Sequence, residues 1–287
     1  MMDVSIIIPV FQRTEWVKQC IDRLQEQEFM GTFEIILVDD GSPNAPEIEK
    51  TVERHSAAEG TVRYMKKNHS GPAAARNYGA SHATGAILCF LDDDSLAEKM
   101  WLYEITRPFE CDEAAAVVSG RVLSLDQHAG LSFALEKAIY SGKHWATCNI
   151  AYKRSVFEKL GGFDETFPEP SWEDNDLGLR ARWAGYSHIY NEKAVIYHPH
   201  ERTVSEYKKK CLLNGRGAAV FCRKYILSKP LWGIGTPLIM SRRLIYGIFP
   251  SVWMKRTHAL AYLRFLWSLY SLRGFLSSIM RIQYGNH

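Results

Sequence analysis

Apolar runs and amphipathic stretches alternate along the first part of the chain. Residues 4–11 (VSIIIPVF) form a continuous, β-branched apolar run, which is typical of a strand buried on both faces. From Thr14 the apolar positions follow a helical spacing along one face. The same design repeats, with strand-and-turn segments predicted at 33–42, 61–66 and 86–95 and helical patterns between them. Strands that alternate with helices predict an α/β protein with a parallel sheet and right-handed crossovers.

The pattern is less regular in the following hundred residues. Residues 114–123 and 148–153 are predicted strands, and a helix with acidic residues in its first turn is predicted over 173–186. Residues 187–198 (SHIYNEKAVIYH) are expected to supply one or two further short strands. We therefore place a single α/β domain in residues 1–200.

The pattern changes again from about residue 201, where aromatic and aliphatic residues are interrupted by Lys and Arg. The longest runs without charge, 230–241 and 244–254, are shorter than the roughly 18 residues that a membrane-spanning helix needs. They suit helices that lie in the membrane interface, with Trp and Tyr at the level of the headgroups. We expect residues 201–287 to form such a helical region; a helical subdomain packed on the first domain is the alternative.

The formal net charge of +3 hides a division between these two parts. From Glu201 onward the chain has 15 Lys and Arg and two Glu, whereas the first 200 residues have 20 Lys and Arg and 30 Asp and Glu. Such asymmetry indicates a tail that faces an anionic partner. Interleaved Arg and aromatic residues could stack on nucleic-acid bases, but the long aliphatic runs favour lipid. We expect an anionic membrane surface and no nucleic acid as the partner.

The cysteines and the N-terminus bear on the compartment. The six cysteines are scattered and show neither a CxxC pair nor a zinc spacing, which indicates a reducing compartment. The sequence MMDVSIIIPV lacks a basic leading region, and its apolar run is too short for a signal peptide. We therefore expect a cytoplasmic protein that is peripheral on the inner face of the membrane.

Acidic residues follow two of the predicted strands. The fourth strand ends in FLDDDS (90–95), and the second ends in VDDGS (38–42). Adjacent carboxylates repel one another and raise each other's pKa, so stability alone does not explain them. Because ligands of an open parallel sheet bind outside the carboxyl ends of its strands, two acidic strand ends predict a site. An EF-hand is excluded because the Gly and the later Glu of that loop are missing. A purely structural role for the aspartates, as a helix cap, is the alternative to a site.

An ordered set of motifs lies between residues 4 and 200: SIIIPVFQR, ILVDDGS, GPAAARNYGA, LDDDS, CNIAYKRSVFEKLGGFDE and EDNDLGLRARWAG. Together these motifs resemble the inverting nucleotide-sugar glycosyltransferases of family 2, which have the GT-A fold. Each motif alone is weak, but their order is specific. The resemblance implies a Rossmann-like, mostly parallel sheet flanked by helices. The tail after residue 200 matches no element of the family.

The resemblance also implies a donor site. The residues implied to bind the nucleotide sugar are Pro9, Val10, Phe11, Arg13, Asp39, Asp40, Arg76, Asp92 and Asp93. Asp40 is implied to bind the base, and Asp94 to bind Mn²⁺ or Mg²⁺. Asp92 is implied to hold the ribose or a water on the metal, and His198, which we prefer to His200, is a further metal ligand. Alternate residues of an extended chain face the same side, so we expect Asp92 and Asp94 to face the site and Asp93 to face the opposite side. Of the three aspartates, we therefore expect Asp93 to tolerate replacement best.

An acceptor site is implied by the motif that opens the predicted helix at 173. There Asp174 would be the general base and Glu173 would orient or bind the acceptor, with Trp172 and Asn149 also in contact with it. A helix N-terminus lowers the pKa of a carboxyl group, so we expect Asp174 to be ionised at neutral pH. The alternative for this pair is a helix N-terminal charge without a catalytic role; Asp176 is a weaker candidate for the base.

The resemblance therefore implies a metal-dependent inverting glycosyltransferase of polysaccharide biosynthesis. The commonest donor in the family is a UDP-sugar, although GDP- and dTDP-sugars also occur. The basic, aromatic tail favours a membrane-associated glycan or a lipid-linked acceptor; a soluble glycan, a small molecule or a protein is the alternative. A catalytically inactive nucleotide-sugar-binding module is a further alternative. A glycosidase is disfavoured, because its two carboxylates need no nucleotide pocket.

Overall fold

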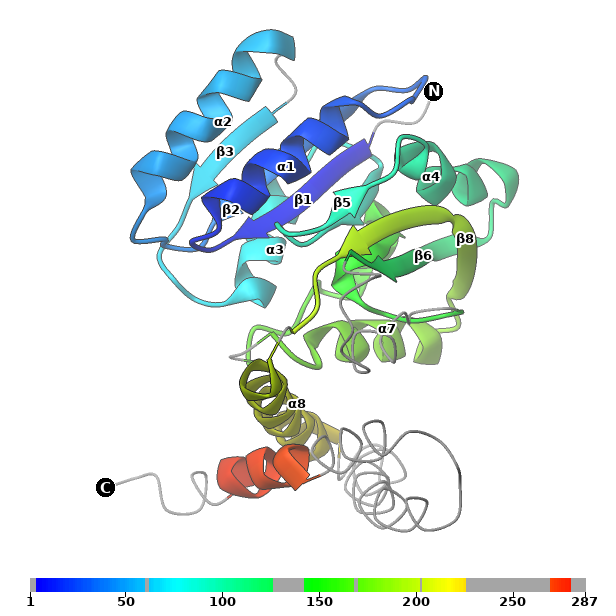
Figure 1. The fold of residues 1–287 in the computed structure, drawn as a ribbon. Helices are drawn as coiled ribbons and strands as arrows, with labels where there is room; N and C mark the ends of the chain where they lie inside the picture. The colour runs from blue at the N-terminus through cyan, green and yellow to red at the C-terminus, as the bar shows by residue number, and fades with distance from the viewer. Residues whose placement is uncertain are drawn as a thin grey trace, which may run out of the picture. The chain divides into compact units, whose positions relative to one another are not determined.

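A computed structural model describes residues 4–59, 62–125, 142–167, 170–201, 203–225 and 269–279 (Figure 1). The chain divides into two compact units. The first consists of Met1–Leu125, Ala138–Glu165 and Asp174–Pro199, and the second of Asp126–Lys137, Thr166–Glu173 and His200–His287. The last of these transitions lies between Pro199 and His200, next to the predicted boundary at residue 200.

One eight-stranded sheet forms the centre of the first unit, in the order β3-β2-β1-β4-β7-β6-β8-β5. The strands are β1 (Val4–Val10), β2 (Phe33–Asp39), β3 (Val62–Lys66), β4 (Ile87–Phe90), β5 (Leu96–Ala97), β6 (Ala115–Ser124), β7 (Ile150–Lys153) and β8 (Ser187–His198). The first four in this order pair in parallel, as do β6 and β8, while β7 and β5 run antiparallel to their neighbours. The predicted mostly parallel α/β sheet is confirmed.

Helices cover both faces of this sheet (Figure 1). They are α1 (Thr14–Gln25), α2 (Ala45–Glu59), α3 (Pro72–His82), α4 (Trp101–Cys111), the short η1 (Thr147–Asn149), α6 (Arg154–Lys159) and α7 (Glu173–Trp183). On β1, Ile6 and Ile8 belong to a core cluster with α1, α2 and α4, whereas Ile7 belongs to a second cluster with α3, α6 and α7. This alternation explains the continuous apolar run, because successive residues of a central strand face opposite helical layers.

The parallel strands bring their carboxyl ends to one edge of the sheet. Val10 at the end of β1 is in register with Asp39 at the end of β2, and Phe90 at the end of β4 is in register with Ile7. The residues that follow these three strands therefore meet at this edge, as the sequence predicts. β8 lies beyond β4, β7 and β6 in the strand order and runs in the same direction as β4, and it ends in His198.

The last strand of the sheet is longer than predicted. Residues 187–198 form one strand of 12 residues, β8, where one or two short strands are expected. Its pairing with β6 passes from Asn191 opposite Gly120 to Val195 opposite Arg121, so it contains an irregularity in the middle. The polar residues at this irregularity interrupt the apolar pattern without ending the strand, since a bulge keeps the pairing on both sides.

In the second unit, α8 (Val204–Tyr225) packs closely against a helix over residues 269–279. A Cβ on Gly215 would lie 1.8 Å from the carbonyl oxygen of Ser271, and one on Gly274 would lie 2.1 Å from that of Leu212. Glycine at both positions is thus required for the two backbones to approach each other. Among the described residues, no helix has the length and hydropathy to span a membrane. The predicted interfacial runs, 230–241 and 244–254, lie outside the described residues.

Candidate active site

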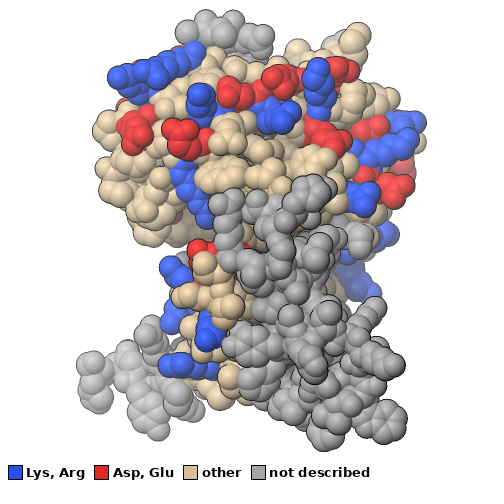
Figure 2. All heavy atoms as spheres, viewed as in Figure 1, with Lys and Arg blue, Asp and Glu red and all other residues tan. Residues whose placement is uncertain are grey.

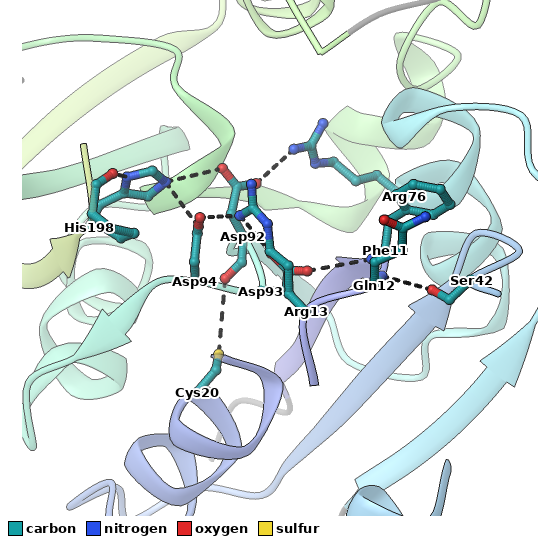
Figure 3. A network of polar contacts seen from close by, with 11 residues as sticks. Phe11, Gln12, Arg13, Cys20, Ser42, Arg76, Asp92, Asp93, Asp94 and His198 are labelled. Atoms are coloured by element: carbon teal, nitrogen blue, oxygen red, sulfur yellow. Dashed lines mark hydrogen bonds and ion pairs between the residues drawn. The ribbon is translucent and has the colours of Figure 1, made fainter. Parts of the chain in front are cut away.

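A strained turn between β1 and α1 begins the site. Gln12 has a positive φ of 68°, which is unusual for a residue with a Cβ. The turn is held from the β2 side, because Gln12 N–H donates to Ser42 Oγ at 2.9 Å and Asn44 Nδ2 donates to the Gln12 carbonyl at 3.3 Å. The next residue, Arg13, is thereby directed toward the aspartates that follow β4 (Figure 3).

Arg13 contacts two of the three aspartates. Its Nη1 lies 3.2 Å from Asp93 Oδ1 and also donates to Asp94 Oδ2 (Figure 3). The other oxygen of Asp93 accepts a hydrogen bond from Phe11 N–H at 3.4 Å. Asp93 is buried and engaged with the β1–α1 turn, so it does not point away from the site as expected, whereas its tolerance of replacement stays a prediction. Burial, reinforced by the charge of Asp94, raises the pKa of Asp93 to about 7.

Asp92, Asp94 and His198 form a cluster that can hold a metal ion, with ligand atoms that all lie within 4.8 Å of one another. His198 Nε2 lies 3.1 Å from Asp94 Oδ1 and 3.8 Å from Asp92 Oδ2 (Figure 3). Ligands about 2.1 Å from Mg²⁺ or Mn²⁺ and at right angles to each other are about 3.0 Å apart, so His198 and Asp94 already have this spacing at 3.1 Å and Asp92 would have to move closer. Asp94 Oδ1 is buried and accepts no well-aligned hydrogen bond within the described residues. The donor set and its spacing therefore fit a hard divalent cation.

Cationic side chains compensate these carboxylates. Arg76, which is buried, donates from Nη2 to Asp92 Oδ1 at 2.8 Å. Burial alone would raise the pKa of Asp92, but the neighbouring His198 and Arg76 outweigh it and hold that pKa well below its usual range. Burial alone would lower the pKa of His198, but Asp94 and Asp92 raise it to about 10. The aspartates are thus balanced by Arg13, Arg76 and His198, and His198 would release a proton on binding a metal.

The acidic pair after β2 is engaged within the protein. Asp39 Oδ1 accepts from Ser42 N–H at 2.7 Å, and its Oδ2 accepts from the hydroxyl of Tyr64. Asp40 accepts from the backbone N–H groups of Ser70 and Gly71 at 3.0 and 2.8 Å. Both carboxylates therefore shape the turn and the loop before α3. Base binding by Asp39 and Asp40 stays a prediction, and it would have to use the oxygen lone pairs that these contacts leave.

Aromatic rings flank this loop at the surface. The ring of Phe11, which is 40% exposed, lies 4.8 Å from that of His69, with an interplanar angle of 33°. His69 also contacts Asp40. Sequence reasoning missed His69, because a lone histidine in a loop carries no pattern. Pro9 is half-buried, but Val10 is fully buried in the core cluster with α1, so its side chain does not face a base as predicted.

Asp174 lies in the first turn of α7, close enough to Arg76 and Asp92 for their charges to affect its pKa. Burial raises its pKa, although hydrogen bonds from Asn175 and the charge of Arg76 act in the opposite direction. The expectation of a pKa lowered by the helix N-terminus is therefore wrong in sign, because burial outweighs the helix dipole. Glu173 is buried beside it. Asp176 is fully buried and paired with Arg180 Nε at 2.8 Å, which gives it a structural role.

Two residues predicted to touch the acceptor have other roles in the structure. Asn149 is fully buried: its Oδ1 accepts from Trp101 Nε1 at 2.8 Å, and its Nδ2 donates to the carbonyls of Arg121 and Ala194. Direct contact with an acceptor is contradicted, because this amide ties α4 to the strands. Trp172 has a positive φ of 74° and packs within the second unit, with Nε1 donating to Asn214 Oδ1 at 3.1 Å.

Residues 5–129, which contain the strained turn and the three aspartates, match the sequence family described as Glycosyl transferase family 2. These residues belong to glycosyl transferase family 2. The resemblance found in the motifs is confirmed. The family 2 domain thus supplies the β1–α1 turn, the Asp39–Asp40 pair and the aspartates after β4, whereas Asp174 and His198 come from later in the chain.

Two glycosyltransferases match the chain over a longer stretch than residues 5–129. The chain is 29% identical over 246 residues to a pre-mycofactocin glycosyltransferase of Mycobacterium tuberculosis, covering 80% of this chain and 50% of that protein. It is 26% identical over 224 residues to glycosyltransferase AglE of Haloferax volcanii, covering 75% and 72%. The chain thus spans about half the length of the mycobacterial relative.

A solved structure shares the fold. The mannosyltransferase PcManGT from Pyrobaculum calidifontis, in complex with GDP-Man and Mn²⁺, superposes with a TM-score of 0.64 at 16% identity. The match covers 99% of this chain and 88% of that chain. The predicted GT-A architecture, with a mixed, mostly parallel sheet between helices, is confirmed.

Proposed function

We propose that the chain is a metal-dependent inverting glycosyltransferase that moves a sugar from a nucleotide-diphosphate sugar to an acceptor hydroxyl. The observation that carries this proposal is the convergence at one sheet edge of a three-ligand cluster, Asp92, Asp94 and His198, with a carboxyl group of raised pKa, Asp174. Family membership supports the reaction class. A glycosyl donor with a diphosphate leaving group needs a cation, and the attacking hydroxyl needs a base.

The donor is expected to lie over the edge formed by β1 and β2. The exposed ring pair of Phe11 and His69 offers a surface on which a base can stack. The aspartates after β4, with Arg13 and Arg76, would receive the ribose and the diphosphate. PcManGT, which shares the fold, holds GDP-Man. We propose a nucleotide sugar as the donor, and UDP-sugars as the first to test.

Asp92, Asp94 and His198 would hold Mn²⁺ or Mg²⁺. When bound, such an ion stabilises the negative charge that grows on the leaving diphosphate. His198 and Arg76 together lower the pKa of Asp92, and the buried Arg76, which donates to Asp92 at 2.8 Å, keeps this carboxylate oriented toward the cluster. The chain thus offers two carboxylates of the kind that hard cations take, together with one ring nitrogen.

Asp174 would act as the general base. A base is most effective when its pKa lies near the working pH, and burial moves the pKa of Asp174 upward from its ordinary value. The charge of Arg76 limits this rise, so that the carboxylate form remains accessible. In a single displacement, the acceptor oxygen gives its proton to Asp174 and bonds to the anomeric carbon, while the bond from that carbon to the diphosphate breaks. Attack opposite to the leaving group inverts the configuration.

The acceptor is proposed to be a membrane-associated glycan or a lipid-linked acceptor, reached by a cytoplasmic enzyme peripheral to an anionic membrane. Basic side chains recur along α8, with Lys208, Lys209, Lys210, Arg216, Arg223 and Lys224 against a single acid, Glu206. Figure 2 shows Lys and Arg on the described part of the second unit, with few acidic groups among them. Polybasic segments of this kind bind anionic lipid surfaces.

Membrane binding can be measured directly. The full chain is expected to sediment with vesicles that contain phosphatidylserine and not with vesicles of phosphatidylcholine alone, and salt should weaken the association. Replacing Lys208, Lys209 and Lys210 by Gln should reduce the bound fraction severalfold. Equal recovery with both kinds of vesicle, or none with either, would contradict the membrane proposal and leave the transferase proposal intact.

Substitution of the base tests the transferase proposal. A thermal-shift screen of UDP-, GDP- and dTDP-sugars with Mn²⁺ first identifies the donor, and transfer is then measured with Asp174→Asn. The variant is expected to keep donor binding and to lose about 10²–10⁴-fold in the transfer rate, since general base catalysis contributes about that much. The matched control is Asp112→Asn, which alters an exposed carboxylate at the end of α4. Transfer by Asp174→Asn at the control rate would exclude Asp174 as the base.

A further inference from the structure

Arg13 contacts one of the carboxylates, that of Asp94, which would hold the metal. Its Nη1 contacts Asp94 Oδ2 and lies 3.2 Å from Asp93 Oδ1, while Asp94 Oδ1 faces His198 at 3.1 Å (Figure 3). Both oxygens of Asp94 are therefore next to a cationic side chain. A divalent ion on Asp94 would face the guanidinium across one carboxylate, and like charges at this distance repel.

The position of Arg13 is imposed by the backbone. The positive φ of Gln12 is maintained by the hydrogen bonds from Gln12 N–H to Ser42 and from Asn44 to the Gln12 carbonyl. Phe11 N–H in the same turn donates to Asp93. The turn and the aspartates are thus fastened to each other independently of the Arg13 side chain, so the guanidinium can leave without loss of the turn.

Arg13 differs from Arg76 in its freedom to move. The side chain of Arg13 is 51% exposed, whereas that of Arg76 is 4% exposed and is enclosed beside Asp92. A guanidinium at the surface can exchange one pair of anionic oxygens for another, and its planar fork suits the oxygens of a phosphate as well as those of a carboxylate.

We propose that Arg13 is a resident counter-cation that competes with the divalent ion for Asp94 until the diphosphate of the donor draws it away. This inference rests on the proposed function, because it needs a diphosphate ligand and a metal on Asp94. Metal alone then binds against the charge of Arg13, and diphosphate alone binds while Arg13 is held by the aspartates. Each ligand removes the obstacle to the other, so the two bind with positive coupling, and the coupling is reciprocal.

Metal binding in the absence of turnover tests this inference. Mn²⁺ affinity is measured by electron paramagnetic resonance for wild type, Arg13→Ala and Arg13→Lys, with and without inorganic pyrophosphate, after correction for Mn²⁺ bound to free pyrophosphate. Pyrophosphate lacks a base and a sugar, so the readout depends on neither the donor's identity nor transfer. The matched control is Arg23→Ala, which removes an exposed arginine near the other end of α1.

Wild type is expected to bind Mn²⁺ at least about tenfold more tightly when pyrophosphate is present. Arg13→Ala should bind Mn²⁺ alone about tenfold more tightly than wild type and should lose most of the coupling. Arg13→Lys, which keeps the charge without the planar fork, should lie between the two, and Arg23→Ala should match wild type.

Unchanged or weaker binding of Mn²⁺ alone by Arg13→Ala, or full coupling in that variant, would overturn the inference. Thermal melting of each variant establishes that it is folded, and the exposure of Arg13 favours this. Failure of the proposed function looks different: transfer would be absent with every nucleotide sugar while the Mn²⁺ titrations still separate Arg13→Ala from wild type.

Discussion

Two groups of acids follow β2 and β4, the strands on either side of β1, and they have different sets of partners. Asp39 and Asp40 accept from three backbone N–H groups and the hydroxyl of Tyr64, and Asp40 also pairs with Lys67 at 2.9 Å. The aspartates after β4 face cationic side chains, Arg13, Arg76 and His198. The same sequence signal, adjacent aspartates after a buried strand, has two different structural outcomes.

The difference shows which acids can exchange partners. A backbone N–H group cannot leave its carboxylate without a rearrangement of the loop, so the pair after β2 maintains the shape of the site. A side-chain cation can move away and be replaced by a metal ion. We therefore expect substitutions in the first group to lower mainly stability and those in the second group to lower mainly transfer.

The largest effect is expected from Asp94→Ala, which removes a metal ligand and a partner of Arg13. Transfer should fall by about 10³-fold or more, because the charge on the leaving diphosphate loses its stabilising cation. The free energy of unfolding should change by less than about 1 kcal/mol, since like charges are relieved as a partner is lost. Transfer rates and urea unfolding measure both quantities. Chelation of wild type with EDTA should reproduce the loss of transfer, and a metal-independent rate would contradict the metal site.

A smaller effect on transfer and a larger one on stability are expected from Asp40→Ala. The change leaves the backbone N–H groups of Ser70 and Gly71 without their acceptor, which should lower the free energy of unfolding by about 2–4 kcal/mol. Asp40→Asn keeps one acceptor oxygen and should lose about half as much. If Asp40→Ala were as stable as wild type and lost only nucleotide binding, the comparison would fail and Asp40 would contact the base directly.

The smallest effect is expected on the pH dependence of stability and comes from Glu34, which lies near the start of β2, away from the acidic edge of the sheet. Burial would raise the pKa of Glu34, but hydrogen bonds from Thr84, Arg63 and Ser5 outweigh it and lower the pKa to about 2. A carboxyl group with a lowered folded-state pKa stabilises the protein fully above about pH 4.5 and loses this contribution as the pH falls toward 2.

Glu34→Gln should therefore be less stable than wild type at pH 7, and the difference should shrink between pH 4.5 and pH 2. Thermal melting across this range measures it, with Glu15→Gln, an exposed residue of α1, as the control. A constant difference between Glu34→Gln and wild type at every pH would show that the charge of Glu34 does not contribute.

The sequence predicts the sheet edge well because its signals are local and strong. The apolar runs of β1, β2 and β4 and the acids after them follow directly from pattern, and parallel pairing then brings their ends together. A pattern does not show which way one side chain points. The resemblance implies Val10 at the base, although its side chain packs against α1, and Asn149 at the acceptor, although its amide binds Trp101 and two carbonyls.

The sequence also does not show which cationic side chains compensate the three aspartates. Three adjacent aspartates look uncompensated until the chain folds and brings Arg13, Arg76 and His198 to them from other elements. The predicted sign of the pKa shift of Asp174 is wrong for the same reason. Its place at a helix N-terminus is visible in the pattern, whereas the burial that outweighs the helix dipole depends on packing with distant residues.

Arg180 has a consequence for how variant libraries of this protein should be scored. It pairs with Asp176 on α7 and donates to the carbonyls of Leu160 and Gly162, so it anchors the helix that carries Asp174 to a turn earlier in the chain. In a library scored by transfer alone, substitutions of Arg180 would group with those of Asp174. A second score for abundance or thermal stability should separate them, since we expect loss of Arg180 to lower stability and loss of Asp174 to leave it largely unchanged.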